Sequence, residues 1–240
     1  MNRLWWGLML LLCLPALAET TLRAGVANDS GESLRTTVDG GLALAYRDAL
    51  ALIAQQSGIR FQLDYYPSQR LEQLFQVGKL DVEVGVHPSW RALSPVAGFY
   101  TQPVADEEFV LCLPPGKGKR PAPLSSLKGG TIGTLLGQRY PSLEAAFGSR
   151  KLLRDGSANE DEMLDKLRQG RVQAVVLERR RAQYWSRRDE GGRCLPGESV
   201  GSLPVSLRLH PQYRELLPRL NQAIQQLNEQ GRLRPLFARR

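Results

Sequence analysis

The chain has 240 residues, of which 42% are hydrophobic, and its 32 Lys and Arg outnumber its 24 Asp and Glu, giving a net charge of +8. This length can bury a substantial core, either in one large domain or in two modest lobes. With only two His and three Cys in the whole chain, the composition argues against a zinc site, and we expect neither a metal nor a cofactor.

The first residues have the three parts of a secretory signal peptide. Arg3 supplies a positive start, an apolar run follows over residues 4–14, and a small-x-small cleavage triplet ends at Ala18. The run is too short to span a membrane comfortably, and no second run of that length follows. Lipid attachment at Cys13 is disfavoured, because Leu12 stands where a small residue is needed. We therefore expect cleavage after Ala18 and a soluble periplasmic protein that does not span a membrane.

Cleavage there leaves Cys112 and Cys194 as the remaining cysteines. An even count in an oxidising compartment favours a disulfide between them, and two unrelated buried thiols are the alternative. Export also argues against nucleic-acid binding, despite the positive net charge. The arginines at 179–181 and 187–188 instead predict a solvated helix face.

The first half of the mature chain alternates between strand and helix patterns. The expected elements are a strand over 21–26, a loop over 28–41, a helix over 42–56, a strand over 59–65, a helix from 67 to Gly78, and a strand over 80–86. This β-α-β-α-β order argues for a sheet flanked by helices.

The second half predicts a similar alternation. Residues 157–160 have the form of a capping box and predict the start of a helix. The expected elements are strands over 109–113, 131–136, 172–177 and 205–209, helices near 140–147, from 160 to Gly170, around 184–185 and from 216 to Gly231, and loops over 114–123 and 191–204.

One segment occurs twice. Residues 71–84 (LEQLFQVGKLDVEV) and 163–176 (MLDKLRQGRVQAVV) each predict the end of an amphipathic helix, then a Gly, a basic residue and a buried strand. Their separation is too long for a solenoid repeat and suggests two similar α/β lobes with a ligand cleft between them. We place lobe 1 at 19–108 plus 203–240 and lobe 2 at 109–202, with the two crossings forming a hinge.

Four stretches, in this order, resemble the extracytoplasmic solute-binding proteins of family 3, which feed polar amino acids to ABC importers. They are TLRAGV at 21–26, GKLDVEVGVHPSWR and GFYTQPV within 78–104, GGTIGTLLGQRY at 129–140, and LRQGRVQAVVLERRRAQY at 167–184. The resemblance covers nearly all of residues 20–237. It implies the type II two-lobe periplasmic binding protein fold, in which each lobe is a mainly parallel sheet flanked by helices and a two-strand hinge joins the lobes.

The resemblance also implies a ligand site. Arg91 falls on the family's arginine that grips a ligand carboxylate with two parallel donors. Glu178 falls on the acidic position that holds the ligand's ammonium. Gly137, Gln138 and Arg139 fall on a turn where backbone N–H groups at a helix start meet the carboxylate. A zwitterion held at both ends across the cleft would favour closure of the lobes.

The chain departs from the family's pattern around this site. A shortened loop carries His87 and Trp90 in place of small hydroxyl residues, and the first loop, which contains Asp29, lacks an aromatic-rich stretch. We predict ligand contacts for these three residues as well. Glu178 is one methylene longer than the usual Asp, and Arg139 replaces a hydroxyl and could favour a second ligand carboxylate. These changes put an ordinary amino-acid ligand in doubt.

Each assignment has a structural alternative. Arg91 could be a surface arginine, Arg139 a solvated residue of a first helical turn, and Trp90 a packing residue. Glu178 could instead neutralise the arginines at 179–181.

Three functions follow, in order of preference. The first is a monomeric periplasmic solute-binding protein, not an enzyme, that captures a small polar solute (an amino acid or related carboxylate) for an ABC permease or a sensor protein. The second is a dehydratase-like enzyme on the same fold, with Glu178 as proton donor. The third is a scaffold that has lost solute binding. A G-x-S-x-G pattern at 197–201 does not predict a hydrolase, because a Pro and a strand follow it instead of a helix.

Overall fold

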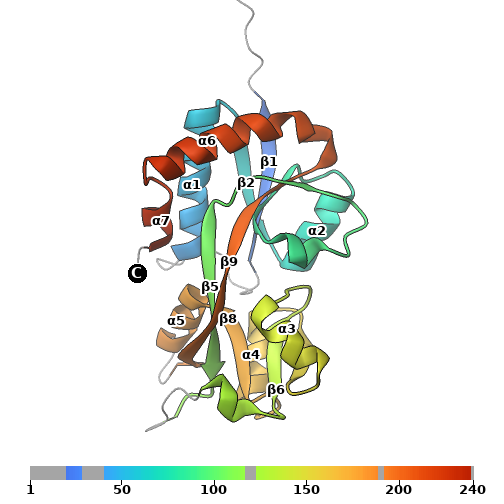
Figure 1. The fold of residues 1–240 in the computed structure, drawn as a ribbon, viewed down its shortest axis with the longest axis vertical. Helices are drawn as coiled ribbons and strands as arrows, with labels where there is room; N and C mark the ends of the chain where they lie inside the picture. The colour runs from blue at the N-terminus through green and yellow to red at the C-terminus, as the bar shows by residue number, and fades with distance from the viewer. Residues whose placement is uncertain (1–19, 29–40, 117–122, 189–191, 239–240) are drawn as a thin grey trace, which may run out of the picture.

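The computed structural model describes residues 20–28, 41–116, 123–188 and 192–238. These residues form two α/β lobes, one above the other in Figure 1, with two long strands running between them. The predicted signal peptide and Asp29 lie outside the described residues. Within the described ranges, no helix has both the length and the apolar character needed to cross a membrane.

Each lobe is built from five elements in the same order. In the first lobe they are β1 (Thr21–Ala27), α1 (Gly41–Ser57), β2 (Arg60–Tyr66), α2 (Ser68–Gln76) and β3 (Val82–Val86). In the second they are β6 (Thr131–Leu135), α3 (Pro141–Gly148), β7 (Leu153–Ser157), α4 (Glu160–Arg168) and β8 (Ala174–Glu178). The first strand of each set lies in the middle, because β1 pairs in parallel with β2 and β3, and β6 with β7 and β8. The predicted two-lobe α/β fold is confirmed.

The repeated sequence segment corresponds to α2–β3 in the first lobe and α4–β8 in the second. Leu71 points from α2 into the core, as Met163 does from α4. Gly78 and Gly170 follow the two helices with φ angles of 67° and 71°, a left-handed conformation that glycine adopts without a Cβ penalty. The repeat in the sequence therefore marks the same pair of elements in each lobe.

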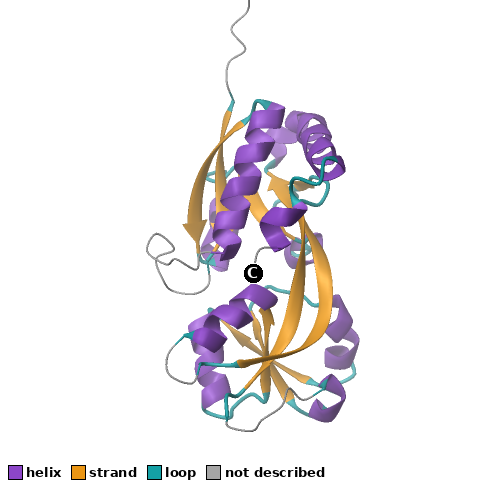
Figure 2. Ribbon diagram, turned by 90° about the vertical axis from the view of Figure 1, so that its left-hand side faces the viewer, coloured by secondary structure: helices purple, strands orange, loops and turns teal. Residues whose placement is uncertain are grey.

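Two long strands, β5 (Ala105–Leu113) and β9 (Leu195–Leu209), connect the lobes and pair antiparallel with each other (Figure 2). In addition, β9 pairs with β3 of the first lobe and β5 pairs with β8 of the second. Each crossing strand thus adds one antiparallel strand to the sheet of one lobe, and together they form the two-strand hinge. The lobe boundaries near residues 108 and 202 stay a prediction, and both positions lie within these strands.

The crossing strands are longer than the sequence pattern predicts. The prediction of a loop over 191–204 is wrong for most of that range, because β9 begins at Leu195. Pro196, Gly201 and Pro204 suggest a break in the strand. Over this stretch, however, β9 pairs with β5 alone, and a strand with one free edge tolerates Pro and Gly.

The start of α4 is also displaced from its prediction. Asn159 caps the helix by accepting a hydrogen bond of 2.8 Å from the backbone N–H of Glu162, whose carboxylate accepts one of 2.9 Å from the N–H of Ala158. The capping box predicted at Ser157 begins two residues too early, because Ser157 is the last residue of β7. The sequence pattern does not predict β7, an edge strand that pairs only with β6 among the described strands and whose sequence LRDGS has no β-branched residue.

The remaining elements include one further strand, which pairs with β9, and several helices. They are β4 (Phe99–Tyr100), α5 (Arg179–Arg187), α6 (Leu217–Glu229), α7 (Arg234–Ala238) and short 3₁₀ helices at Pro88–Arg91, Leu124–Leu127 and Pro211–Leu216. Helix α6 packs against α1 on the first lobe (Figure 1), and Ile53 and Ile224 are among the fully buried side chains of that core.

A disulfide joins Cys112 of β5 to Cys194, the residue before β9, with the two Cα atoms 5.5 Å apart. Both cysteines are buried and pack with Trp185 in the core of the second lobe. Of the two alternatives left by the sequence, the structure contains the bond.

Candidate functional site

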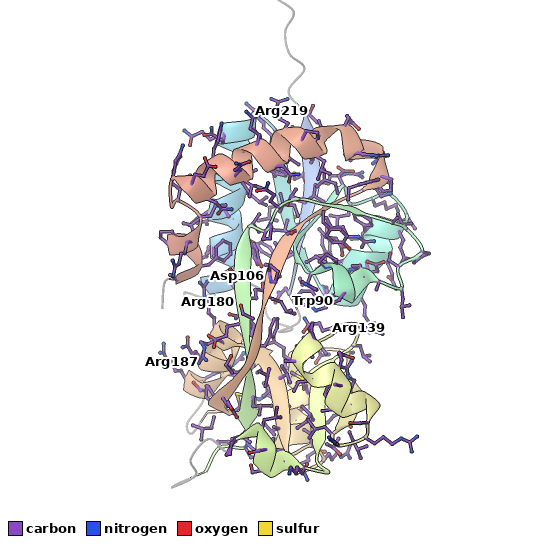
Figure 3. The ribbon with its side chains drawn as sticks, viewed as in Figure 1. Trp90, Asp106, Arg139, Arg180, Arg187 and Arg219 are labelled. Atoms are coloured by element: carbon purple, nitrogen blue, oxygen red, sulfur yellow. A yellow bond between two sulfur atoms is a disulfide. The ribbon has the colours of Figure 1, made fainter. Side chains whose placement is uncertain are left out.

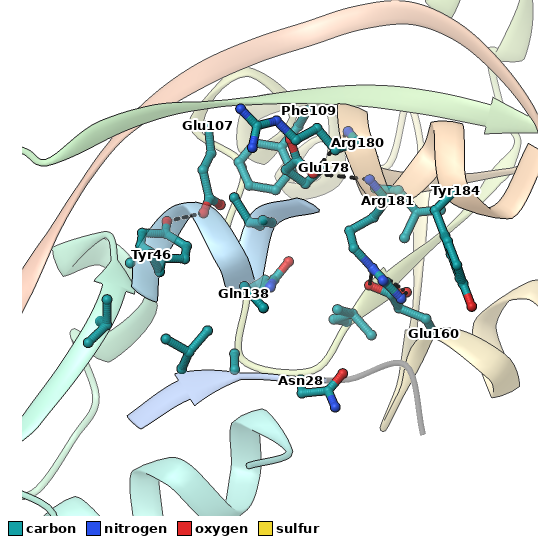
Figure 4. Close-up of a pocket in the computed structure, with 18 of the residues that line it drawn as sticks. Asn28, Tyr46, Glu107, Phe109, Gln138, Glu160, Glu178, Arg180, Arg181 and Tyr184 are labelled. Atoms are coloured by element: carbon teal, nitrogen blue, oxygen red, sulfur yellow. Dashed lines mark hydrogen bonds and ion pairs between the residues drawn. The ribbon is translucent and has the colours of Figure 1, made fainter. Parts of the chain in front are cut away.

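A cavity of about 120 Å³ lies between the two lobes (Figure 4). The first lobe contributes side chains from α1 and β3, the second from β8 and α5, and the hinge from β5. Much of the wall is apolar, with Leu42, Val84, Phe109 and Leu177 among its members. Polar side chains also line it, and the hydrogen-bond partners of each one decide what the cavity can bind.

Tyr46 of α1 and Glu107 of β5 form a buried pair on the cavity wall (Figure 4). The Tyr46 hydroxyl donates a hydrogen bond to Oε1 of Glu107. Gly85 makes room for this contact, because a Cβ atom at that position would lie 2.3 Å from the Tyr46 hydroxyl oxygen. Burial, and then the nearby charge of Glu178, raise the pKa of Glu107 to about 8. Glu107 therefore carries a proton at neutral pH.

Glu178, at the end of β8, caps helix α5. Its Oε2 accepts hydrogen bonds of 2.9 Å and 3.1 Å from the backbone N–H groups of Arg180 and Arg181. Burial is the largest influence on this carboxyl and raises its pKa, although the two backbone hydrogen bonds act in the opposite direction. Glu178 thus lines the cavity, and part of its carboxylate is used by the helix; its contact with a ligand ammonium stays a prediction.

The three consecutive arginines at the start of α5 have different surroundings. Arg179 pairs with Glu108, with 2.6 Å between Nη2 and Oε1. Arg181 pairs with the buried Glu160, with 3.0 Å between Nε and Oε2. Nη2 of Arg180 is buried and has no hydrogen-bond partner among the described residues, although the guanidinium lies 5.9 Å from the Phe237 ring. The predicted solvated face is therefore wrong for Arg180 and Arg181, which line the cavity.

No family model and no curated protein matches this chain, but solved structures do. An ancestral arginine-binding protein bound to arginine matches with a TM-score of 0.66 at 19% identity, over 90% of this chain and 96% of that one. An arginine 3rd transport system periplasmic binding protein from Legionella pneumophila matches with a TM-score of 0.70 at 13% identity, over 91% and 98%. An ancestral amino acid-binding protein, a precursor of cyclohexadienyl dehydratase, matches with a TM-score of 0.63 at 17% identity, over 90% and 93%. This chain has the two-lobe periplasmic binding protein fold. The fold implied by the four sequence stretches is thereby confirmed.

Within this binding-protein fold, Arg91 lies in a cluster of charges in the first lobe. Its Nη2 lies 2.9 Å from Oε1 of Glu83, and its Nε lies 2.7 Å from Oε2 of Glu72. Both carboxylates also pair with Arg208. The guanidinium borders a second cavity of about 380 Å³ beside α2, which Gly137 also lines. The prediction that Arg91 grips a ligand carboxylate stays a prediction, and its donors already have protein partners.

Of the other predicted site residues, Gln138 lines a cavity, whereas His87 and Arg139 are not among the lining residues of either one. Gln138 lines the first cavity and accepts a hydrogen bond of 2.6 Å from the Tyr140 hydroxyl. His87 accepts one of 3.2 Å from the backbone N–H of Ser89, and burial lowers its pKa. The Arg139 side chain is exposed. Within the described ranges, no group of His, Cys, Asp and Glu is placed to hold a metal ion.

Trp90 links the two lobes of the binding-protein fold. Its Nε1–H donates a hydrogen bond of 2.8 Å to the backbone oxygen of Arg139 in the second lobe, and its ring packs edge-on against Phe109 with centroids 6.0 Å apart. It lines both cavities and so lies between them. Figure 3 shows Trp90 and Arg139 at the junction of the lobes.

We expect Trp90→Phe to weaken this contact while keeping an aromatic ring against Phe109. Loss of one hydrogen bond is worth about 1 kcal/mol, so the ratio of contacting to separated lobes in ligand-free protein falls about fivefold. Distances between spin labels, one on each lobe, measure this ratio. Arg139→Ala is the matched control, because it keeps the backbone oxygen that accepts the bond. An unchanged distance distribution in Trp90→Phe would show that the indole bond does not hold the lobes together.

Sequence reasoning missed most of the cavity's polar residues, and Tyr46, Glu107 and Arg180 are among them. Glu107 lies two residues before Phe109 on β5, so the two side chains point to the same face of the strand. A strand predicted from residue 105 instead of 109 would have shown an acidic residue facing the cleft. The ring of Tyr46 packs in the core of the first lobe, and the residue also lines the cavity.

Proposed function

We propose that this chain is a solute-binding protein that captures a small solute bearing a carboxylate, such as an amino acid or a related acid, in the cavity between its lobes. The observation that carries this proposal is the guanidinium of Arg180, whose Nη2 is buried without a hydrogen-bond partner among the described residues and which lines the cavity. A buried cationic donor without a partner is unfavourable. A ligand carboxylate removes this penalty by accepting hydrogen bonds from the guanidinium.

The arrangement suits capture by closure. Arg180 belongs to the second lobe, Tyr46 to the first, and Glu107 to the hinge. A solute that contacts all three binds more tightly when the lobes are together than when they are apart, and this difference in affinity drives closure. The α5 cap uses Oε2 of Glu178. The other oxygen of that carboxylate, Oε1, would hold a ligand ammonium where one is present.

The wider role follows from the same proposal. The chain would be exported to the periplasm by its signal peptide, act as a monomer and deliver its solute to an ABC importer or to a signalling partner. The transport-system protein among the solved structures of this fold supports the first of these two partners.

We expect Arg180→Met to weaken binding of the captured solute by about 100-fold, because truncating one partner of a buried charge pair costs about 3 kcal/mol. A thermal-shift screen with amino acids, polyamines, dicarboxylates and aromatic acids finds the solute, and calorimetric titration gives its dissociation constant. Arg187→Met is the matched control, because it removes the same charge from an exposed position on the same helix, away from Arg180 in Figure 3. Equal affinities in the two variants would contradict the role of Arg180.

The same titration tests the residue proposed from the resemblance. Suppose that Arg91→Ala loses solute binding but still unfolds cooperatively, and that Arg180→Met still binds the solute. This result would assign the ligand carboxylate to Arg91. If none of these compounds raises the unfolding temperature, solute binding is contradicted altogether and the scaffold alternative is favoured.

A second candidate function, a dehydratase-like enzyme, is favoured by one observation. The carboxyl of Glu107 faces the cavity and its pKa of about 8 keeps it protonated at neutral pH, and a protonated carboxyl in a cleft can act as a general acid. One of the solved structures with this fold is a binding protein that preceded such an enzyme. An ultraviolet assay with prephenate-like cyclic acids separates the two functions. Turnover that is lost in both Glu107→Gln and Glu178→Gln would establish the enzyme, and absence of turnover would exclude this candidate.

A further inference from the structure

We propose that Arg180 and a protonated Glu107 form one carboxylate-binding subsite, in which both groups donate hydrogen bonds to the same ligand carboxylate. This inference rests on the proposed function, and it names the protein groups and the proton that would select the ligand. Neither residue was singled out by the sequence resemblance, and both lie on the wall of the cavity between the lobes.

The surroundings of Glu107 determine where its proton lies. The side chain is buried on the hinge strand, and within the described ranges no Lys, Arg or His forms an ion pair with it. A buried carboxyl without a cationic partner is expected to be neutral. Tyr46 donates to Oε1, so Oε1 acts as the carbonyl oxygen. The proton then lies on Oε2, where it is available to a ligand.

Charged and titratable groups from several elements surround Glu107. Tyr46 faces it from α1, Glu178 from β8 and Arg180 from α5. Its neighbour Glu108 is paired with Arg179 instead. Burial and the charge of Glu178 raise the pKa of Glu107, while the Tyr46 hydrogen bond and the charge of Arg180 lower it, and the balance is a value of about 8.

Arg180 and the protonated Glu107 can donate hydrogen bonds to the same ligand carboxylate. A neutral Glu107 does not compensate the positive charge of Arg180, and Nη2 of Arg180 has no hydrogen-bond partner among the described residues. A ligand carboxylate supplies a negative charge beside Arg180, in addition to that of the nearby Glu178, and has lone pairs for both the guanidinium and the carboxylic acid. A neutral amide ligand supplies no charge, so the subsite discriminates acids from their amides.

The subsite makes binding depend on pH in one direction. At neutral pH Glu107 carries its proton both in the free protein and in the complex, so the affinity is constant. Above pH 8 or thereabouts the free protein has lost this proton and must take it up again to bind, so the dissociation constant rises about tenfold per pH unit. Without the proton, the ligand carboxylate would instead face the ionised Glu107 and be repelled.

Calorimetric titration between about pH 6 and pH 9 tests the inference. The probes are L-phenylalanine, L-leucine, L-glutamine and hydrocinnamate, with hydrocinnamamide as the neutral counterpart of the last. Hydrocinnamate has no ammonium group, so its own ionisation does not change over this range. We expect the amide not to bind and the bound acids to weaken about fivefold from pH 8 to pH 9, because half of Glu107 is already ionised at pH 8.

Variants of Glu107 separate the proton from the shape of the side chain. Glu107→Gln should give an affinity that no longer changes with pH, because its amide donor does not titrate. Glu107→Leu should bind at least about tenfold more weakly than the wild type at neutral pH, because it has no donor. Asp106→Asn is the matched control on the same strand, since Asp106 is exposed (Figure 3), and it should keep the wild-type pH profile.

The outcomes distinguish this inference from the proposed function. If the acids bind and Glu107→Gln shows the same pH profile as the wild type, the subsite is wrong and solute binding stands. If none of the acids binds the wild type, both proposals fail. A carbon-13 NMR titration of the Glu107 carboxyl in ligand-free protein gives an independent check, and a carboxyl that ionises at an ordinary glutamate pKa would overturn the inference.

Discussion

Replacing Arg208 by methionine is expected to lower the free energy of unfolding by about 4 kcal/mol, because it removes one partner of a buried ion pair. The side chains of Arg208 and Glu83 are both completely buried, and they lie 2.5 Å apart between Nη1 and Oε2. Arg208 also pairs with Glu72 and donates a hydrogen bond of 2.6 Å to the backbone oxygen of Val96. Its loss leaves Glu83 with Arg91 as its remaining cation.

Urea denaturation measures this effect as a lower midpoint at an unchanged slope. The double variant Arg208→Met/Glu83→Gln is the informative comparison. It removes the buried negative charge together with the positive one, so it should be more stable than Arg208→Met alone. If Arg208→Met unfolds within about 1 kcal/mol of the wild type, the cluster does not behave as a buried ion pair.

The same cluster explains why the role of Arg91 is hard to derive from the sequence. The resemblance places Arg91 at a ligand, and its position after β3 is well determined by the repeat that predicts β3. The direction of its guanidinium depends on Glu83 and on Arg208, which comes from β9 far along the chain. Such long-range partners are set by tertiary packing, which a local pattern does not contain.

The surroundings of the arginines at 179–181 likewise depend on tertiary packing. Sequence shows three adjacent cations after a strand, and it gives no basis for choosing among them. Glu108 on β5 forms an ion pair with Arg179, and Glu160 on α4 forms one with Arg181. Neither carboxylate pairs with Arg180, so its Nη2 has no hydrogen-bond partner among the described residues. The strand and a helix that carries these arginines could be predicted from the sequence, but which arginine keeps a donor without a partner could not.

The lobes themselves were predictable because their signals are local. Helix periodicity, a glycine that ends the helix and a buried strand occur in both copies of the repeat, and these features do not depend on distant partners. The hinge strands were only partly predictable. In the sequence, their Pro and Gly residues indicate an interruption of the strand. In the structure, β9 pairs with β5 on one edge only over this stretch, which is why the strand tolerates these residues and continues.

Removing the disulfide between Cys112 and Cys194 is expected to lower the free energy of unfolding by about 4 kcal/mol, because a bridge across a loop of this length strongly restricts the unfolded chain. The two cysteines are 82 residues apart in sequence, so the loop contains most of the second lobe. Both sulfurs are buried with Trp185 in that lobe's core, and replacing them by Ala also removes packing volume. Urea denaturation of the Cys112→Ala/Cys194→Ala variant measures the combined effect.

Reduction of the wild-type protein separates the bond from the packing. A thiol reductant should lower the stability of the wild type and leave the double variant unchanged, because only the wild type has a bond to break. Free thiols detected in unreduced, unfolded wild-type protein would show that the bond does not form. The bond lies inside the second lobe, and Arg180 is carried by α5 of that same lobe. A loss of ligand affinity on reduction, at temperatures where the first lobe stays folded, would therefore show that the disulfide holds in place the helix that positions the carboxylate-binding arginine.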